Sequence, residues 1–422
     1  MLDLVRFELK KLLARRTSQV VAVGVLALLC VIMALNVVQT KTRSDAGEIV
    51  GGTAAIAQQK ARAEAHEGVL TVERVQEEVA AYKALAFSKV DPAQVEGLNA
   101  EAAYTLMNEA YSEDEFRAIY DTYFSYLLSP WITGGLEQYQ VAAQLGDEDV
   151  AGFYGAVAAM LQRALDDGMG GTWTFSDAER AYWTDKQAGV GEPLAYGYAG
   201  GWADVMACIG FLAFAMVAVC VVLTPVFAGE YQDRTDAVLL AARYGRSKLV
   251  AAKIVASLLF ATAYFALATA VIMGVALAFF GAEGGDLPVQ VLGLGIPYDL
   301  TMAEATWTAV GLGYLMTLGL AGLTLLLSSK LRRSQLAIFA ACAALIFLTG
   351  MIPSGGSGAL QHVLYLFPIN ALNDQVLYNA LVSYPVGPLV VDLVGLLAVA
   401  YALVLVVCAP LAARAFRRHQ VM

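Results

Sequence analysis

The chain has 422 residues, of which 59% are hydrophobic and 15% are charged, and its mean hydropathy is +0.60 at a net charge of −10. These values exclude an ordinary soluble protein and indicate a membrane protein. The charges gather in residues 41–203, which hold 25 of the 37 acidic and 11 of the 27 basic side chains, so this segment is predicted to be a separate polar domain.

The first 17 residues are basic and amphipathic. Four apolar residues share one face of the helix predicted for residues 1–17, namely Leu2, Val5, Leu9 and Leu12. Four basic residues can reach lipid headgroups from this helix, namely Arg6, Lys10, Lys11 and Arg15. Either an interfacial cytoplasmic helix or a simple positively charged anchor fits the pattern. The apolar run that follows is longer than the core of a signal peptide, so residues 18–40 are predicted to form a retained first transmembrane helix.

Residues 41–203 show helical periodicity. One apolar stripe has spacings of three and four, and it consists of Val72, Val75, Val79, Tyr82 and Ala86. Ser112 to Glu115 and Ser176 to Glu179 both fit the capping box that begins many helices. The first box precedes a stripe at helical spacing, which consists of Phe116, Ile119, Tyr120, Tyr123 and Leu127. The domain is therefore predicted to be mainly α-helical, and its aromatic stripe forms either core or a ligand groove.

Five further apolar runs approach the roughly 20 residues that cross a bilayer. They are residues 204–228, 251–281, 304–329, 336–353 and 393–413. The sixteen basic residues outside 41–203 lie before the first span, between 229 and 253, between 330 and 333, or after 413. By the positive-inside rule, 229–250, 330–335 and 414–422 are cytoplasmic, and the loops 282–303 and 354–392, which have no basic residue, lie outside. The second of these loops is apolar and rich in Gly and Pro, so short re-entrant helices are predicted in it.

The expected fold is thus an all-α polytopic membrane protein with six transmembrane helices and both termini in the cytoplasm. A mainly helical extracytoplasmic domain, residues 41–203, is inserted after the first transmembrane helix.

The segment between the second and third predicted spans carries a recognisable order of residues. Positions 227–253 read FAGEYQDRTDAVLLAARYGRSKLVAAK. This order resembles the cytoplasmic segment of ABC-2 type permeases, the transmembrane subunits of ABC exporters. In that family a Glu ends the second span, a Thr follows five residues later, a Leu-Leu pair closes a short helix, and Arg and Lys precede the third span. The matching positions here are Glu230, Thr235, Leu239, Leu240, Arg246 and Lys253. The motif LFPINAL at 366–372 also looks like this family, whereas the polar domain lies outside the resemblance and leaves the substrate open.

The resemblance implies a coupling helix that sits in a groove of a cytoplasmic ABC ATPase subunit. The residues expected at this contact are Glu230, Asp233, Arg234, Thr235, Asp236, Leu239, Leu240, Arg243, Arg246 and Lys248. The sequence has no Gly-x-x-x-x-Gly-Lys-Ser/Thr phosphate loop, so ATP and Mg would bind to the partner ATPase. All five cysteines lie in apolar runs and the chain has only three histidines, so no catalytic, metal or cofactor site is predicted in it.

The resemblance further implies a multi-pass protein of a prokaryotic plasma membrane, paired with a second permease copy or a paralogue. It would export an amphipathic or hydrophobic substrate such as a peptide, lipid or drug. The acidic balance of the polar domain argues against nucleic acid as a partner. Two alternatives stay open, namely a membrane sensor or interaction protein that uses the polar domain, and an intramembrane serine protease that uses Ser357 of a GxSG motif.

Overall fold

The computed structural model describes residues 1–44, 48–242, 244–245, 247–331, 335–353, 356–373 and 375–418, without the side chains of Met169, Asp236, Leu239 and Leu240. The described residues are mostly helical, as predicted. They divide into two compact units. The first unit comprises Met1–Leu35, Asp204–Leu277 and Thr306–Met422, and the second comprises Asn36–Ala203 and Ala278–Ala305.

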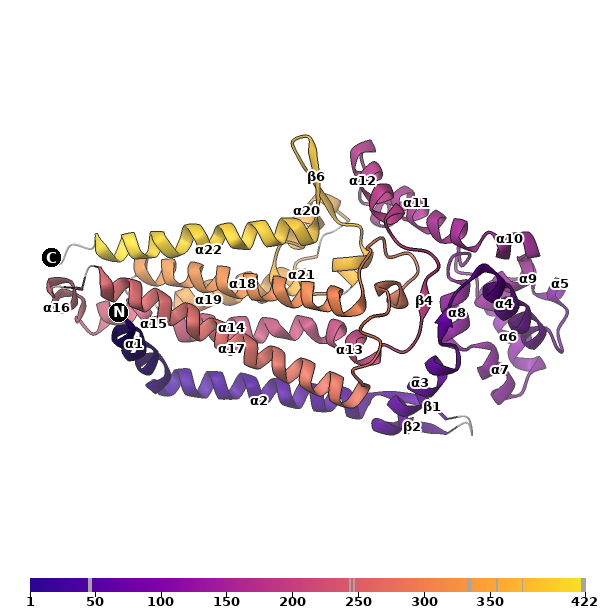
Figure 1. The fold of residues 1–422 in the computed structure, drawn as a ribbon, viewed down its shortest axis with the longest axis horizontal. Coiled ribbons are helices and arrows are strands. Elements are labelled where there is room, and N and C mark those ends of the chain that lie inside the picture. The colour runs from indigo at the N-terminus through magenta and orange to yellow at the C-terminus, as the bar shows by residue number, and fades with distance from the viewer. Residues whose placement is uncertain are drawn as a thin grey trace. The chain divides into compact units, whose positions relative to one another are not determined.

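The first unit is built around long apolar helices, whose axes run nearly parallel to one another in Figure 1. The helices and helical turns that contribute to this unit are α1 (Leu2–Ala14), α2 (Arg16–Gln39), α13 (Gly200–Cys208), η1 (Ile209–Phe211), α14 (Leu212–Leu223), α15 (Pro225–Gln232), α17 (Lys248–Phe280), α18 (Met302–Lys330), α19 (Gln335–Phe347), η3 (Leu348–Met351) and α22 (Leu393–Arg417). The short α16 (Asp236–Ala241) lies between α15 and α17.

Five helical segments within the described residues are long and apolar enough to cross a membrane. They are Arg16–Gln39, Gly200–Gln232, Lys248–Phe280, Met302–Lys330 and Leu393–Arg417. The apolar segment Gln335–Met351 is shorter, with 13 residues in α19 and 4 in η3. At about 1.5 Å per residue this segment falls short of the ~30 Å hydrocarbon core. The sixth transmembrane helix therefore stays a prediction.

The helical segment Gly200–Gln232 is interrupted at Pro225, and Ser328 of α18 forms hydrogen bonds with the backbone groups left free there. Proline has no N–H to donate, so the helical hydrogen bonds are interrupted there. The Ser328 hydroxyl accepts hydrogen bonds from the N–H groups of Phe227 and Ala228, both at 3.0 Å, and donates to the carbonyl oxygen of Thr224 at 2.7 Å. This buried contact fixes α15 against α18.

The loop predicted at 354–392 contains short helices, whose re-entry into the membrane stays a prediction, and also a hairpin that the sequence did not predict. The helices are α20 (Gly358–Leu364), α21 (Pro368–Ala371) and the π-helical turn η4 (Gln375–Asn379). Strands β5 (Ser383–Val386) and β6 (Leu389–Asp392) pair antiparallel, with Ser383 opposite Asp392. The two-residue turn between them is possible because Gly387 adopts a φ of 61° ahead of Pro388.

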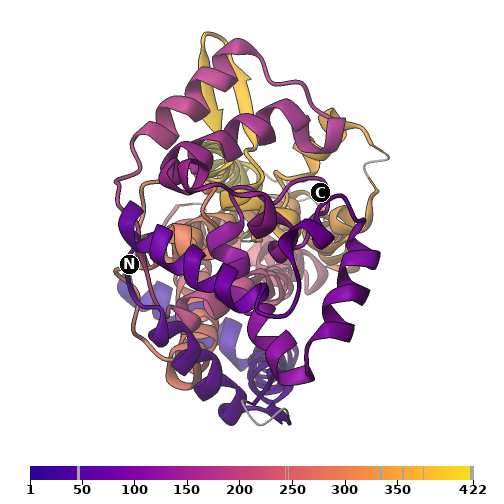
Figure 2. The ribbon, with the colours of Figure 1, turned by 90° about the vertical axis from the view of Figure 1, so that its right-hand side faces the viewer.

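The second unit consists of short helices that run in several directions (Figure 2). Its helices are α3 (Thr53–Ala65), α4 (Val72–Ala86), α5 (Pro92–Val95), α6 (Ala100–Ala110), α7 (Glu113–Ile119), α8 (Thr122–Leu128), α9 (Gln138–Gln144), α10 (Asp147–Ala151), α11 (Phe153–Gly171), α12 (Asp177–Ala188) and the single turn η2 (Val289–Leu292). Strand β1 (Lys41–Arg43) pairs with β2 (Ile49–Gly51), and β3 (Gly68–Val69) pairs with β4 (Ala195–Tyr196), both antiparallel. Of the stripe predicted over Val72, Val75, Val79, Tyr82 and Ala86, α4 buries the last four in the core, whereas Val72 is half-buried.

The aromatic stripe after Ser112 is part of this core, but it is divided between two helices, α7 and α8. Both predicted capping boxes are present, at Ser112 and at Ser176. Helix α7 ends at Ile119, and the carboxylate of Asp121 accepts a hydrogen bond from the N–H of Tyr123 at 2.8 Å. Asp121 therefore caps a new helix, and a capping residue has non-helical backbone angles that interrupt the preceding helix.

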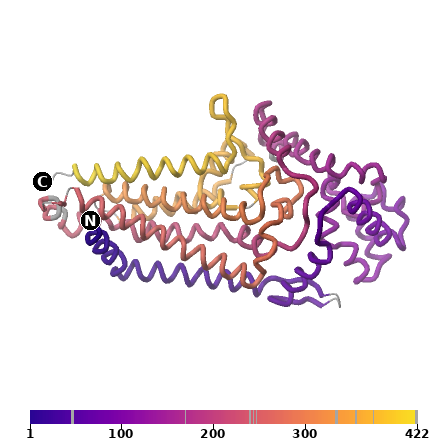
Figure 3. Tube along the Cα trace, viewed as in Figure 1, coloured from indigo at the N-terminus to yellow at the C-terminus, as the bar shows by residue number. Residues whose placement is uncertain are grey.

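The segment Ala278–Ala305 belongs to the second unit although it is separated from the rest of that unit by more than 70 residues of sequence. Figure 3 traces both passes of the chain by colour. Leu294 is 1% exposed within the core of this unit. The indole N–H of Trp202 donates to the carbonyl oxygen of Ala282 at 3.0 Å, and Lys60 forms an ion pair with Glu283.

This arrangement predicts that residues 36–203 expressed alone unfold at a lower temperature than the same segment joined by a flexible linker to residues 278–305. Without residues 278–305 the burial of Leu294 is lost, which alone lowers the free energy of unfolding by about 1.5–3 kcal/mol. Thermal unfolding followed by circular dichroism measures the difference. As a control, Glu283→Gln in the joined protein removes only a half-exposed ion pair and is expected to change the melting temperature little. Equal melting temperatures with and without residues 278–305 would contradict the assignment of this segment to the unit.

Candidate functional site

A cluster of buried charges joins three helices of the first unit. Glu230 of α15 is 3% exposed, Lys253 of α17 is 2% exposed and Glu8 of α1 is 5% exposed. Lys11 of α1 completes the cluster and is partly exposed. Two carboxylates thus face two ammonium groups, and this balance removes most of the cost of placing charge inside a protein.

Glu230 is the centre of this charge cluster. Its Oε1 accepts hydrogen bonds from Lys253 Nζ at 2.7 Å and from Lys11 Nζ at 2.5 Å. Its Oε2 accepts from the hydroxyl of Thr235 at 2.5 Å. Lys253 Nζ also donates to Glu8 Oε2 at 2.9 Å. The hydrogen bonds from Lys253 to Glu8 and to Glu230 therefore connect α1, the end of α15 and the start of α17.

Helix α1 reaches the charge cluster because one of its faces packs on α17. Val5, Glu8 and Leu12 are buried at spacings of three and four, which places them on one side of the helix. Val5 contacts the small residues Ala252 and Ala256 of α17. Small side chains allow two helices to approach closely, so Glu8 comes within hydrogen-bonding distance of Lys253.

A tight turn ends α15 and explains why a threonine stands five residues after the glutamate. Arg234 has a φ of 53°, the left-handed conformation that commonly follows a helix end. The N–H of Thr235 then donates back to the carbonyl oxygen of Glu230 at 3.0 Å, which is the Schellman closure. The same turn carries the Thr235 hydroxyl to the Glu230 carboxylate. Backbone and side chain together fix the point at which the chain leaves α15.

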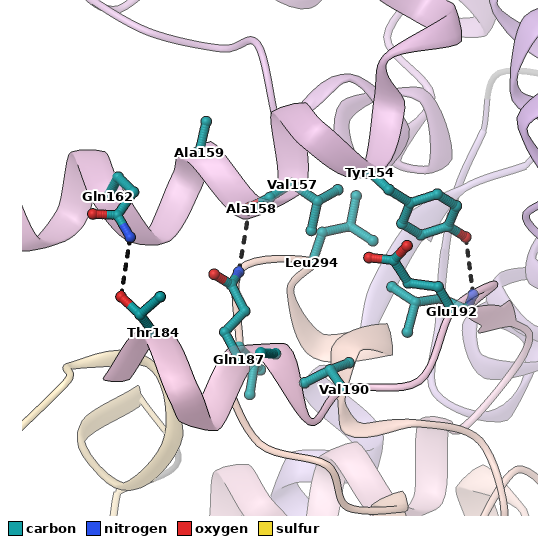
Figure 4. Close-up of a pocket in the computed structure, with 13 residues that line it drawn as sticks. Tyr154, Val157, Ala158, Ala159, Gln162, Thr184, Gln187, Val190, Glu192 and Leu294 are labelled. Atoms are coloured by element: carbon teal, nitrogen blue, oxygen red, sulfur yellow. Dashed lines mark hydrogen bonds between the residues drawn. The ribbon is translucent and has the colours of Figure 1, made fainter. Parts of the chain in front are cut away.

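A groove in the second unit is a separate candidate for ligand binding. It has a volume of about 550 Å³ and lies between α11, α12 and residues 190–194, with Leu294 and Ile296 in its wall. Figure 4 shows Gln162 joined to Thr184, and Gln187 joined to the Val157 carbonyl, across the two helices. The groove is mainly apolar, and the exposed Glu192 adds a carboxylate to its lining. Among the described residues, no group of three or more His, Cys, Asp or Glu side chains is arranged to hold a metal ion.

Comparison with protein families decides the identity of the chain. The sequence model for the family described as "ABC-2 family transporter protein" matches residues 6–419. The chain belongs to the ABC-2 transporter family. Comparisons with curated proteins and with solved structures gave no match. The matched range includes residues of both units, so the polar domain lies within it.

The predicted coupling residues of this ABC-2 permease fall into three groups. Glu230 is in the charge cluster, and the hydroxyl of Thr235 donates a hydrogen bond to it. Exposed positions are Asp233, which ends α15, Arg234 in the turn, and Lys248 at the start of α17. The third group is only partly visible, because Arg243 and Arg246, and the side chains of Asp236, Leu239 and Leu240, lie outside the described residues.

The predicted interfacial residues of the permease are also divided. Arg6 and Lys10 are exposed on α1, whereas Lys11 contacts Glu230 and Arg15 follows the end of α1. The apolar face differs in part from the one expected, because Val5 and Leu12 are buried while Leu2 is 78% exposed. Sequence reasoning missed Glu8 as a site residue and left Lys253 out of the site. A single acidic residue on the buried face of a basic helix was the available signal for Glu8.

Ser357 of the protease-like motif has a structural role in the permease. Its hydroxyl accepts a hydrogen bond from the N–H of Leu360 at 3.4 Å and so caps α20. His362 Nδ1 contacts the carbonyl oxygen of Gly358 at 2.8 Å, within the same helix. Gly355 of the motif lies outside the described residues. The structure gives the serine protease alternative no support.

Proposed function

We propose that this chain is the transmembrane permease subunit of an ATP-driven ABC exporter. Its substrate would be amphipathic or hydrophobic, such as a peptide, lipid or drug taken from the cytoplasm or inner leaflet. Family membership supports a membrane transporter component. The observation that carries the finer proposal is the charge cluster, because it connects two long apolar helices and the N-terminal helix directly to the segment that contains α16.

The charge cluster suits the transmission of movement from α16 to the apolar helices. Helix α16 begins at Asp236, directly after Thr235, whose hydroxyl contacts Glu230. Separating a buried ion pair leaves charges unpaired at a cost of several kcal/mol. Movement of α16 would therefore displace α15 through the contact of Thr235 with Glu230. It would also displace α17 through the ion pair between Glu230 and Lys253.

The proposed partner at α16 is a separate cytoplasmic ABC ATPase subunit that binds ATP and Mg. The side chain of Val238 on α16 is 74% exposed, although a valine is usually covered. An exposed apolar residue beside the charges of Asp233 and Arg234 fits the core and rim of a protein interface. A second permease copy or a paralogue would complete the transport pathway.

Orientation follows from the basic residues and is tested by labelling. In a variant without native cysteines, Glu101→Cys and Asp286→Cys place exposed thiols in the second unit, and Ser247→Cys places one between α16 and α17. We expect an impermeant thiol reagent added to intact cells to label positions 101 and 286 and to leave position 247 unlabelled. Labelling of position 247 from outside would contradict the orientation.

The test of the function itself is purification of the full chain from its native membranes. An ATPase with a phosphate-binding loop is expected to copurify, and the reconstituted pair should hydrolyse ATP and move an amphipathic reporter dye across the bilayer. Recovery of the chain without any ATPase under conditions that preserve membrane complexes would overturn the proposal.

The groove of the second unit favours one second role, ligand sensing. A sensor would copurify with a kinase or another signalling protein in place of an ATPase. The same purification therefore separates the two functions.

A further inference from the structure

A pocket of about 450 Å³ lies in the first unit where α2 begins. Its polar lining consists of Arg15, Thr17, Ser18, Thr224, Gln232, Asp233 and Gln335. Its apolar lining includes Val221 and Phe339. The pocket shares no lining residue with the charge cluster around Glu230, so its polar groups need another explanation.

Arg15 brings positive charge to this pocket. Its guanidinium lies against Gly229, where an added methyl group would approach Nη2 to 3.3 Å. Its Nη1 is buried and has no hydrogen-bond partner within the described part of the chain. A buried guanidinium nitrogen without an acceptor is costly, and a bound anion would supply the missing acceptor.

The first turn of α2 contributes Thr17 and Ser18 to the lining of the same pocket. Helix α2 has 24 residues, and the N–H groups of its first turn have no acceptor within the helix. Ser18 lines the pocket, is 4% exposed, and makes no hydrogen bond through its hydroxyl to any described residue. A helix N-terminus, a buried free hydroxyl and a guanidinium together form an anion site of the kind that phosphate occupies.

The pocket also contains one carboxylate. Asp233 is exposed at the end of α15 and has no ion-pair partner among the residues that the structure describes. The amides of Gln335 and Gln232, which are joined at 2.8 Å, lie in the same lining. A simple anion would be repelled by Asp233, whereas a ligand that carries both a phosphate and an ammonium group would satisfy both charges.

The apolar surface next to this pocket indicates what else the ligand carries. Leu336 lines the pocket and is 75% exposed. A pocket of this volume holds a headgroup, and acyl chains would lie along the exposed side chain of Leu336.

We propose that this pocket binds the headgroup of a glycerophospholipid with a primary ammonium group, such as phosphatidylethanolamine. The phosphate contacts Arg15, Ser18 and the first turn of α2, and the ammonium group contacts Asp233. The site depends neither on a partner ATPase nor on the direction of transport, so it can fail or hold independently of the proposed function.

Native mass spectrometry of the purified full chain tests this site, with phosphatidylethanolamine and phosphatidylglycerol of matched acyl chains as probes. We expect phosphatidylethanolamine to bind more tightly, because phosphatidylglycerol offers Asp233 no ammonium group. Arg15→Ala should weaken binding of phosphatidylethanolamine roughly tenfold or more, the effect of losing a charge-assisted hydrogen bond. Ser18→Val should weaken it severalfold. Asp233→Asn should abolish the preference between the two lipids.

Arg16→Ala is the matched control, because Arg16 is the exposed neighbour, carries the same charge and does not line the pocket. It should leave phosphatidylethanolamine binding unchanged. Equal losses in Arg15→Ala and Arg16→Ala would show general charge attraction and overturn the site. Equal binding of both lipids by the unmodified chain would also overturn it. Binding of soluble phosphoethanolamine without binding of either lipid would assign the site to a soluble ligand and contradict the lipid. If Arg15→Ala does not fold, Ser18→Val and Asp233→Asn decide the question.

Discussion

Replacing Lys253 with Met is expected to lower the free energy of unfolding by about 3–5 kcal/mol, the cost of leaving buried charge without its partner. Lys253 Nζ contacts both Glu8 Oε2 and Glu230 Oε1. After the substitution Glu230 keeps Lys11 and Thr235, but Glu8 loses the contact that compensates its burial. Thermal unfolding of the purified chain in detergent measures the effect, with a decrease in Tm on the order of 10 °C.

Two variants separate the loss of this ion pair from other effects. Glu8→Gln combined with Lys253→Met removes both charges and should recover most of the lost stability, because removal of a whole buried pair is often nearly neutral. Lys10→Met changes the same kind of side chain at an exposed position of α1 and should leave Tm unchanged. If the double variant melts as low as Lys253→Met, the ion pair is not what stabilises this junction.

Replacing Leu239 and Leu240 with Asp is expected to abolish copurification of an ATPase and transport together. Both residues belong to α16, next to the exposed Val238, in the segment proposed to contact the ATPase. Two carboxylates forced into an apolar contact cost several kcal/mol, which lowers association by orders of magnitude. Membrane insertion should survive because α16 lies outside the five long apolar segments. The measurement is the amount of ATPase recovered per permease after affinity purification.

The control for this pair of charges is Val386→Asp with Leu389→Asp. These residues of the β5–β6 hairpin are 51% and 65% exposed, so the substitution adds the same charges to another exposed apolar pair. ATPase recovery should be unchanged in this variant. Unchanged recovery in the Leu239 and Leu240 variant would show that the ATPase contact lies elsewhere and would remove α16 from the proposed mechanism.

Sequence alone was sufficient for features that depend on neighbouring residues. Hydropathy over about 20 residues located the long apolar helices, because the cost of burying polar groups in lipid is a sum over one segment. The capping boxes at Ser112 and Ser176 were found because their hydrogen bonds join residues three positions apart. The stripe of α4 was found because helical geometry alone places residues three and four apart on one face. The family was visible in the order of residues from Glu230 to Lys253, and the family match confirms it.

Only the tertiary structure revealed which charges meet and which segments share a core. Glu8 and Lys253 are 245 positions apart, and nothing local distinguishes their buried ion pair from the exposed charges of Arg6 or Lys10. Leu294 lies in a loop that the sequence assigned to no domain, yet it is buried in the core of the second unit. The sequence determined the helices and their capping boxes because the interactions that form them join residues close together in the chain. Burial of a charge or of a loop residue is decided by partners brought from distant parts of the chain, which only the folded chain supplies.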